Sequence, residues 1–321
     1  MITTAVGNYP KVAEGGYGTK LIGALTKWQK QEVTDAQLEA TFQDITAAVI
    51  REQEEAGLDL LTDGQIRWED LVTPIAKRLE GFELNGLERW FNNNVYYRRP
   101  VLQRAPKRTG PILIEEYRFA GRCAKKPVKA VLPGPYTFVR MSEDRHYKAQ
   151  RPFALKMAEI LNAEAVDLAR AGAPFIQFDE PALTAPKPDV KLALEALAIA
   201  AKGVKAKTAV YTYFGSLNGA LEPLLRAKVD VIGLDVVSAP ALLARLKRSK
   251  ITKELAIGCL DARNTKLEPV SAVRTIIRAM AKQIPADRLY VNPNCGLEFL
   301  PHTQALAKVQ RLVEAARAER T

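Results

Sequence analysis

Four short apolar runs in this chain each end in a polar cluster, and this feature constrains the fold most strongly. The runs are FIQFDEPAL at 175–183, AVYTYFG at 209–215, DVIGLDVV at 230–237 and YVNPNCGL at 290–297. Their β-branched and aromatic residues are typical of buried parallel strands. Because parallel strands deliver their carboxyl ends to one face of a sheet, the pattern predicts an α/β protein with a site on that face.

Helical patterns fall between nearly all of the predicted strands. The strands are predicted at 2–6, 58–62, 128–132, 174–178, 207–213, 230–236, 255–260 and 289–293. The helices are predicted at 36–56, 150–172, 192–203, 217–227, 239–248, 268–283 and 301–318. Alternation over about 250 residues predicts a closed eight-stranded (β/α)8 TIM barrel. An open doubly wound sheet is the alternative, which is disfavoured because no glycine-rich dinucleotide fingerprint follows the first strand.

One segment interrupts this alternation. Residues 86–127 contain WFNNNVYYRRPVLQRAP and PILIEEYRFAGR, which we interpret as the two strands of a β-hairpin inserted after the second barrel strand. The chain has no Pro- or Ser-rich linker, low-complexity tract or charge block that would mark a domain boundary. We therefore expect residues 1–321 to form a single domain.

Composition limits the classes of binding partner and the cellular compartment that we expect for this protein. The formal charge is +11, from 47 Lys and Arg against 36 Asp and Glu. This excess suits an anionic small substrate or an acidic protein, or it is simply a solvated basic surface, and no nucleic-acid-binding motif accompanies it. The densest basic cluster contains Arg98, Arg99, Lys125, Lys126 and Lys129. No run is long enough for a membrane helix, no secretory signal opens the chain, and three cysteines cannot all pair, so a cytoplasmic protein is expected.

Residues at the carboxyl ends of the strands are the candidates for chemistry in such a barrel. They are Asn8, Asp63, Gln65, Asp179, Glu180, Tyr213, Asp235, Asp261, Arg263, Asn292, Asn294 and Cys295. A carboxylate at such a position binds a substrate ammonium or acts as a base, or it caps a turn. Cys295 is a ligand, a nucleophile or a small apolar filler. The chain has only two histidines, both in surface-like stretches, which disfavours serine–histidine or cysteine–histidine catalysis.

Several motifs together resemble a single barrel of cobalamin-independent methionine synthase. They are TTAVGNYPKV, AGLDLLTDGQIRWEDLV, WFNNNVYYRRPV, PVKAVLPGPYTF, FIQFDEPAL, TYFG and VNPNCGL, in this order along nearly the whole chain. The resemblance implies a TIM barrel that transfers a methyl group to the sulfur of homocysteine.

The resemblance also assigns roles to individual positions. Asp179 matches the aspartate that holds the amino group of homocysteine in the family, and Cys295 matches a cysteine ligand of the catalytic zinc. Asp235 falls where the family has a glutamate ligand. Asn8 and Gln65 fall at positions that normally hold a serine and a glutamate around the amino acid.

Other positions depart from the catalytic barrel of the family. Tyr213 and Gly215 stand where a His-x-Cys pair supplies two zinc ligands, and Arg263 stands where a functional histidine is found. A catalytic zinc site needs three protein ligands and an open position, so the predicted set of Cys295 and Asp235 is incomplete. TYFG and WFNNNVYY look more like the amino-terminal barrel of the two-barrel enzyme, which has no complete zinc site.

Three functions follow from these observations. The first is a methyltransferase acting on homocysteine or a related small thiol, with a folate donor or a methylcorrinoid carried by a partner corrinoid protein. The second is a non-catalytic folate-binding subunit that docks a second, catalytic barrel in a split methionine synthase. The third is a zinc-free enzyme of different chemistry, such as a lyase or demethylase, in which Asp179, Glu180, Tyr213 and Arg263 form an acid/base and anion-binding set.

Overall fold

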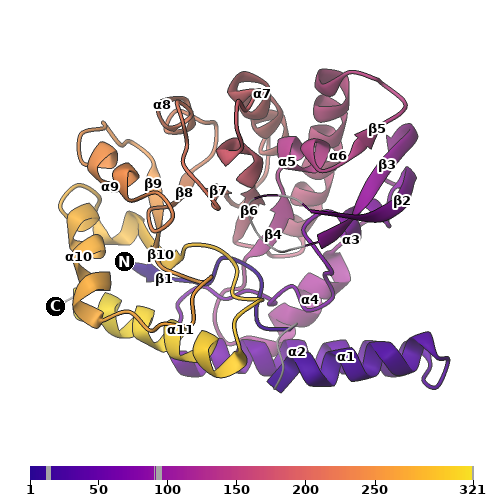
Figure 1. Cartoon of the computed structure of the whole chain (residues 1–321), viewed down its shortest axis with the longest axis horizontal. Coiled ribbons are helices and arrows are strands. Elements are labelled where there is room, and N and C mark those ends of the chain that lie inside the picture. Colours follow the sequence, from indigo (N-terminus) through magenta and orange to yellow (C-terminus); the bar gives the residue numbers. More distant parts are fainter. Residues whose placement is uncertain (12–15, 90, 92–95, 320–321) are drawn as a thin grey trace.

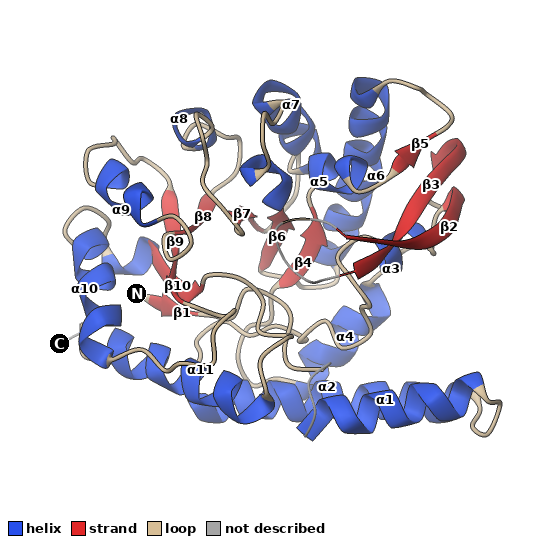
Figure 2. Cartoon of the chain, viewed as in Figure 1, coloured by secondary structure: helices blue, strands red, loops and turns tan. Residues whose placement is uncertain are grey.

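A ring of parallel strands forms the centre of the protein (Figures 1 and 2). The computed structural model describes residues 1–11, 16–89, 91 and 96–319. Seven strands of the ring pair in the order β1-β10-β9-β8-β7-β6-β4. They are β1 (Ile2–Thr3), β4 (Ala130–Pro133), β6 (Phe175–Asp179), β7 (Lys207–Thr212), β8 (Val231–Asp235), β9 (Glu254–Leu260) and β10 (Leu289–Pro293).

The ring closes through a very short eighth segment. Leu60 forms a parallel bridge with Thr4, and the next residue, Leu61, forms one with Val128, just before β4. The strand predicted at 58–62 is thus reduced to two bridges between β1 and β4. This closure agrees with the predicted TIM barrel and excludes the open sheet.

Helices surround the strands in Figure 2. They are α1 (Gly16–Gln29), α2 (Asp35–Ala56), α3 (Thr73–Ala76), α4 (Ile114–Cys123), α5 (Pro135–Arg140), α6 (Gln150–Arg170), α7 (Val190–Ala200), α8 (Leu221–Leu224), α9 (Pro240–Leu246), α10 (Val270–Ala281) and α11 (His302–Arg317). The sequence pattern missed α1, which lies against α2 and projects at the lower right of Figure 1. The helix predicted at 217–227 is mostly wrong, because Gly219 adopts a φ of +84° and only α8 remains.

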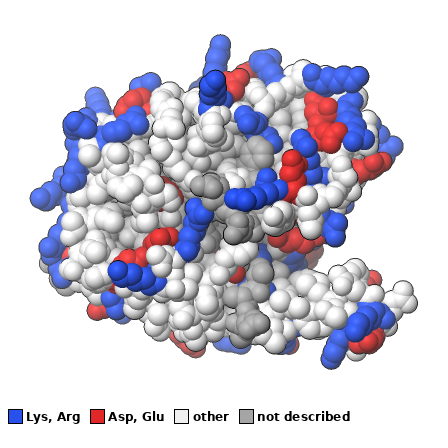
Figure 3. Space-filling view, in the orientation of Figure 1, with Lys and Arg blue, Asp and Glu red and all other residues white. Residues whose placement is uncertain are grey.

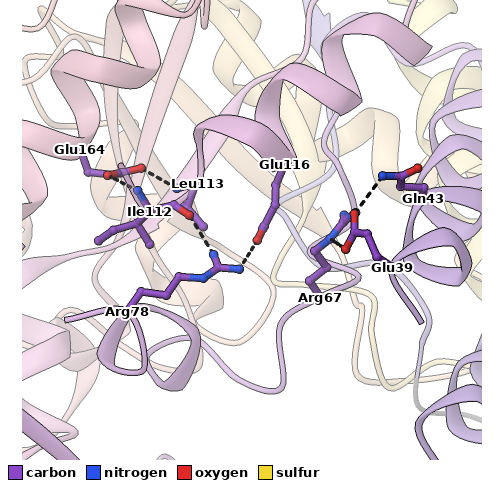
Figure 4. A network of polar contacts seen from close by, with 8 residues as sticks. All are labelled: Glu39, Gln43, Arg67, Arg78, Ile112, Leu113, Glu116 and Glu164. Carbon is purple, nitrogen blue, oxygen red and sulfur yellow. Dashed lines mark hydrogen bonds and ion pairs between the residues drawn. The ribbon is translucent and has the colours of Figure 1, made fainter. Parts of the chain in front are cut away.

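Local signals explain the limits of α2. Thr34 accepts a hydrogen bond from the backbone N–H of Gln37, whose side chain accepts one from the backbone of Thr34, which is a capping box. At the other end Gly57 adopts a φ of +94°, a left-handed conformation that glycine adopts without strain and that commonly ends a helix. Arg67 binds Glu39 of α2 through its guanidinium, with N–O distances of 2.5 and 3.3 Å, and so fastens the loop after the second barrel segment to the helix (Figure 4).

The insertion is a hairpin, but its limits differ from the prediction. β2 (Glu80–Arg89) pairs antiparallel with β3 (Tyr96–Lys107), and β3 pairs with the short β5 (Glu143–Asp144). The segment PILIEEYRFAGR is not a strand, because most of it belongs to α4. Residues 12, 90 and 92–95, which belong to the opening motif and to WFNNNVYYRRPV, lie outside the described residues.

Tertiary contacts show why this segment is helical. The buried carboxylate of Glu164 accepts hydrogen bonds from the backbone N–H groups of Ile112 (2.9 Å) and Leu113 (2.7 Å) (Figure 4). Arg78 donates to the carbonyl of Ile112 at 2.9 Å and forms an ion pair with Glu116 in the first turn of α4. Acidic residues near a helix amino end are favourable, and here they also connect α4 to α6 and to the segment before β2.

The charged residues are distributed without one dominant basic patch on the face drawn in Figure 3. Lys and Arg lie mostly around its edge, with acidic residues among them, and uncharged residues cover much of the middle. Among the described helices, none combines the length and apolar character that crossing a bilayer requires.

Gly233 of β8 tests the close packing inside the barrel. A Cβ at this position would lie 2.5 Å from Cγ of the Tyr211 ring, and Tyr211 is only 2% exposed. We expect Gly233→Ala to lower the free energy of unfolding by about 1–3 kcal/mol, measured by urea denaturation. Gly23→Ala in α1 is the control, since nothing lies within 4 Å of its added Cβ, and it should leave stability equal or higher. Equal stability of Gly233→Ala and the wild type would contradict the packing described here.

Candidate active site

A cavity of about 300 Å³ lies at the carboxyl ends of the barrel strands. It brings together five residues that the sequence singled out: Asn8, Asp179, Tyr213, Arg263 and Cys295. They follow different strands, far apart in the sequence, so the parallel arrangement of the strands is what assembles them.

Aromatic rings form much of the remaining lining, and the sequence analysis did not identify them as site residues. Phe91, Tyr97, Phe214 and Phe299 line the cavity. The ring centroids of Phe91 and Phe214 are 5.4 Å apart, and the Arg263 guanidinium lies 5.6 Å from the Phe214 centroid. Phe214 adopts a φ of +74°, an unusual conformation for a bulky residue. Such backbone strain is concentrated at functional sites, which supports the assignment of this cavity.

Asp179 is the last residue of β6 and is 3% exposed. Its Oδ1 accepts a hydrogen bond from Gln177 Nε2 at 2.7 Å, and its Oδ2 accepts one from the hydroxyl of Tyr213 at 2.9 Å. Burial raises the pKa of Asp179, whereas these two hydrogen bonds and the attraction of Lys129 lower it. The carboxylate therefore combines two fixed donors with access to the cavity, which suits the binding of a cationic group.

Glu180 lies beside Asp179 in the sequence but does not line the cavity. Its carboxylate accepts hydrogen bonds from the backbone N–H of Tyr136 (3.0 Å) and from the N–H (2.7 Å) and hydroxyl (2.6 Å) of Thr137. Burial raises its pKa to about 7, against the hydrogen bonds from Thr137 and Tyr136. The substrate-binding role expected for Glu180 is not supported, because these contacts tie it to the first turn of α5.

Asn8 and Gln65 occupy different positions relative to the cavity. Asn8 lines it, and its Cβ would lie 3.0 Å from a Cβ added at Gly296. Gln65 is 2% exposed, adopts a φ of +49° and packs beneath Gly7, whose added Cβ would lie 3.0 Å from Gln65 Oε1. Its Nε2 has no hydrogen-bond partner among the described residues. The structure thus brings Asn8, but not Gln65, to the cavity surface.

Cys295 and Asp235 lie near each other, and each has local partners. Asp235 Oδ1 accepts hydrogen bonds from the backbone N–H groups of Val237 (3.0 Å) and Ser238 (2.8 Å), while Oδ2 accepts one from Asn294 Nδ2 (3.3 Å). Asp235 does not line the cavity, whereas Cys295 does. Burial, followed by the nearby Asp235, raises the pKa of the Cys295 thiol well above its usual value.

These residues do not fit a catalytic zinc site with three protein ligands. Within the described ranges, no group of three or more His, Cys, Asp or Glu side chains is placed to hold a metal ion. Glu298 follows Cys295 by three residues and lines the same cavity, but its carboxylate lies 3.6 Å from the ammonium nitrogen of Lys11. The hydroxyl of Tyr213 donates to Asp179. Two candidate ligands fall short of the three that a catalytic zinc requires.

Two further residues at the site were not identified as functional from the sequence. Gln177 precedes Asp179 by two positions in β6 and binds it directly. Lys129 belongs to the densest basic cluster of the sequence, but it is 1% exposed and points into the barrel. A lysine and a glutamine within apolar strands are the sequence signal that identifies both, since such groups are buried only with partners.

Comparisons with known proteins agree with this geometry. The family model described as the cobalamin-independent synthase catalytic domain matches residues 1–318. A methionine synthase of Sulfolobus acidocaldarius is 32% identical, covering 97% of this chain and 90% of the relative. A methionine synthase of Saccharolobus solfataricus is 30% identical, covering 99% and 94%.

A solved structure has the same fold. The B12-independent methionine synthase of Shewanella sp. W3-18-1, solved with selenomethionine, superposes with a TM-score of 0.83 at 24% identity, covering 99% of this chain and 97% of that one. The family model covers nearly the whole chain, and both relatives are at least 30% identical to it over more than 95% of its length. The chain belongs to the cobalamin-independent methionine synthase family.

Proposed function

We propose that this protein is a methyltransferase that forms methionine, or a closely related thioether, by methylating the sulfur of homocysteine or a related small thiol. Family membership supports the reaction class. The observation that carries the proposal is Asp179, a carboxylate held by two hydrogen-bond donors and lining a cavity at the barrel mouth. A charged acceptor in that position suits the α-ammonium group of an amino-acid substrate.

The other cavity residues complete the proposed roles. Tyr213 orients Asp179 through its hydroxyl, and Asn8 supplies an amide at the cavity surface. Arg263 lines the same cavity as Cys295, and its positive charge would stabilise a substrate thiolate. In the overall reaction the thiol sulfur forms a bond to the methyl carbon, and the bond between that carbon and its donor breaks with its electron pair left on the donor. The thiol proton passes to the demethylated donor or to water.

The methyl donor is proposed to be anionic. A folate with a glutamate tail is the first candidate, because the formal charge of +11 favours anionic ligands and the family is cobalamin-independent. A methylcorrinoid delivered by a partner protein is the second. Either donor would have to bring its methyl group to the cavity at the mouth of the barrel.

The direct test is methionine formation by the purified chain alone. Homocysteine is supplied with a donor whose methyl group carries an isotope label, either methyltetrahydrofolate in its mono- and triglutamate forms or methylcobalamin. The labelled methionine that forms is measured by mass spectrometry. We expect label transfer from at least one donor without a second protein. Binding of methionine without transfer from any donor would instead favour the non-catalytic subunit of a split enzyme.

Zinc content tests the incomplete ligand set separately. Because Cys295 and Asp235 fall short of three ligands, we expect far less than stoichiometric zinc in protein purified without chelators or a histidine tag. Cys295→Ser should leave that content unchanged, as measured by inductively coupled plasma mass spectrometry. Stoichiometric zinc that is lost in Cys295→Ser would show that ligands outside those named here complete a metal site.

A further inference from the structure

Lys129 is a fully enclosed lysine inside the barrel. Its ammonium nitrogen donates to the carbonyl of Ala5 at 2.6 Å and to Gln177 Oε1 at 2.7 Å. It also lies 4.9 Å from the ring centroid of Tyr211. Burying a lysine is unfavourable unless partners compensate, so its position in the interior calls for an explanation beyond packing.

The contacts of Lys129 determine which way the Gln177 amide faces. A lysine side chain in this position donates to Gln177, so the oxygen of the amide must face Lys129. The amide nitrogen then donates to the carbonyl of Val6 at 2.9 Å, which can only accept. Both neighbours require the same orientation, and the remaining N–H of Gln177 is therefore directed at Asp179.

This orientation has a consequence for Asp179. Because Gln177 presents an N–H, the Oδ1 atom of Asp179 must act as an acceptor, and it does so at 2.7 Å. The second oxygen accepts from Tyr213, so both donors favour the ionised carboxylate over the protonated acid. The positive charge of Lys129 acts in the same direction through the interior of the barrel.

We propose that Lys129, acting through Gln177, is a positioning residue that keeps Asp179 ionised and oriented to bind the ammonium group of the amino-acid substrate. This inference rests on the proposed function, since it assigns a support to the same amine-binding carboxylate. Lys129 does not line the cavity, so it acts through its neighbours and not by contact with substrate.

The electrostatics agree with the geometry. Burial raises the pKa of Asp179 and lowers that of Lys129, and their mutual attraction opposes both changes. Removing Lys129 removes the attraction but not the burial, so the pKa of Asp179 should rise further. The titratable or charged groups that surround Asp179 or share its cavity are Glu69, Asp70, Tyr97, Lys129, Glu180, Tyr211, Tyr213, Arg263, Cys295 and Glu298.

The test is the pH dependence of methionine binding in Lys129→Met, measured by isothermal titration calorimetry. Wild-type affinity should rise with pH as Asp179 ionises. We call this rise in affinity with pH the acid limb. In Lys129→Met it should move to higher pH by at least about one unit, the size of pKa shift that one nearby opposite charge produces. On the acid side of the limb, affinity should therefore be at least about tenfold weaker than in the wild type.

Two further variants make the result specific. Gln177→Leu keeps Lys129 but removes the hydrogen bonds that connect Lys129 to Asp179 through Gln177. It should shift the acid limb in the same direction, so it tests the proposal even if Lys129→Met fails to fold. Lys207→Met is the matched control, because Lys207 pairs with Glu254 at the amino end of β7, and its acid limb should match the wild type.

The outcomes separate this inference from the proposed function. An unchanged acid limb in folded Lys129→Met and Gln177→Leu overturns the role of Lys129, as does a loss of affinity that is equal at every pH. If Asp179→Asn binds methionine as tightly as the wild type, the proposed amine site itself is wrong. Asp179-dependent binding with a shift in both variants supports both.

Discussion

Replacing Asp179 with asparagine should lower kcat/KM for homocysteine by about 10- to 150-fold. The substrate ammonium would lose its charged partner, and a hydrogen bond to a charged group contributes about 1.5–3 kcal/mol. Asparagine also brings an NH2 group to a site where Gln177 and Tyr213 both donate, so at least one of these contacts must be lost. Initial rates of methionine formation over a range of homocysteine concentrations measure the effect.

A substrate without the amino group gives the matching control. The wild type should prefer homocysteine over its deamino analogue, 4-sulfanylbutanoate, and Asp179→Asn should lose this preference. Asp230→Asn serves as the control variant, because Asp230 accepts hydrogen bonds from Thr208 near the amino end of β7, away from the cavity. If Asp179→Asn still discriminates between the two thiols, Asp179 does not bind the amine.

Strand periodicity carried most of the information about the barrel. The buried runs that contain β6, β7, β8 and β10 were visible as apolar segments with polar ends, and parallel pairing then brought those ends into one cavity. The second barrel strand was recognisable from LDLL, although it forms only two bridges. Continuous apolar runs of this kind indicate strands that are buried on both faces, as the strands of a parallel sheet are.

Local patterns failed where tertiary contacts decide the structure. The run PILIEEYRFAGR is apolar enough for a strand, and a short run of this kind does not distinguish helix from strand. Glu164, more than 40 residues away in the sequence, accepts the backbone N–H groups that start α4, and no local pattern reveals this contact. The same limitation hid the connection between Lys129 and the site.

Strand geometry explains what happened at residues 177–180. Alternate residues of a strand point to the same side, so Gln177 and Asp179 share a face and Glu180 points away from it. Applying this rule to FIQFDE distinguishes the two carboxylates from the sequence alone. Treating Asp179 and Glu180 as a pair of site residues overlooked it, and the contacts of Glu180 with Thr137 confirm the difference.

Among the variants named here, a substitution of Glu180 is expected to reduce stability most. Replacing it with alanine leaves the backbone N–H groups of Tyr136 and Thr137 and the Thr137 hydroxyl without their acceptor in a buried region. Each buried group left unpaired costs about 1–3 kcal/mol, so we expect Glu180→Ala to lower the free energy of unfolding by at least about 3 kcal/mol in urea denaturation. Glu195→Ala, which breaks an exposed ion pair with Arg151, should change it by less than about 1 kcal/mol.

Kinetics of the folded fraction then separate a structural role from a substrate-binding one. Because the Glu180 carboxylate faces α5 and not the cavity, the KM for homocysteine should remain at the wild-type value at a temperature where Glu180→Ala is folded. Glu180→Gln retains an acceptor oxygen, so its stability should fall between that of Glu180→Ala and the wild type. If Glu180→Ala instead raises the KM for homocysteine and leaves stability unchanged, Glu180 binds substrate, and the structural role assigned to its carboxylate is wrong.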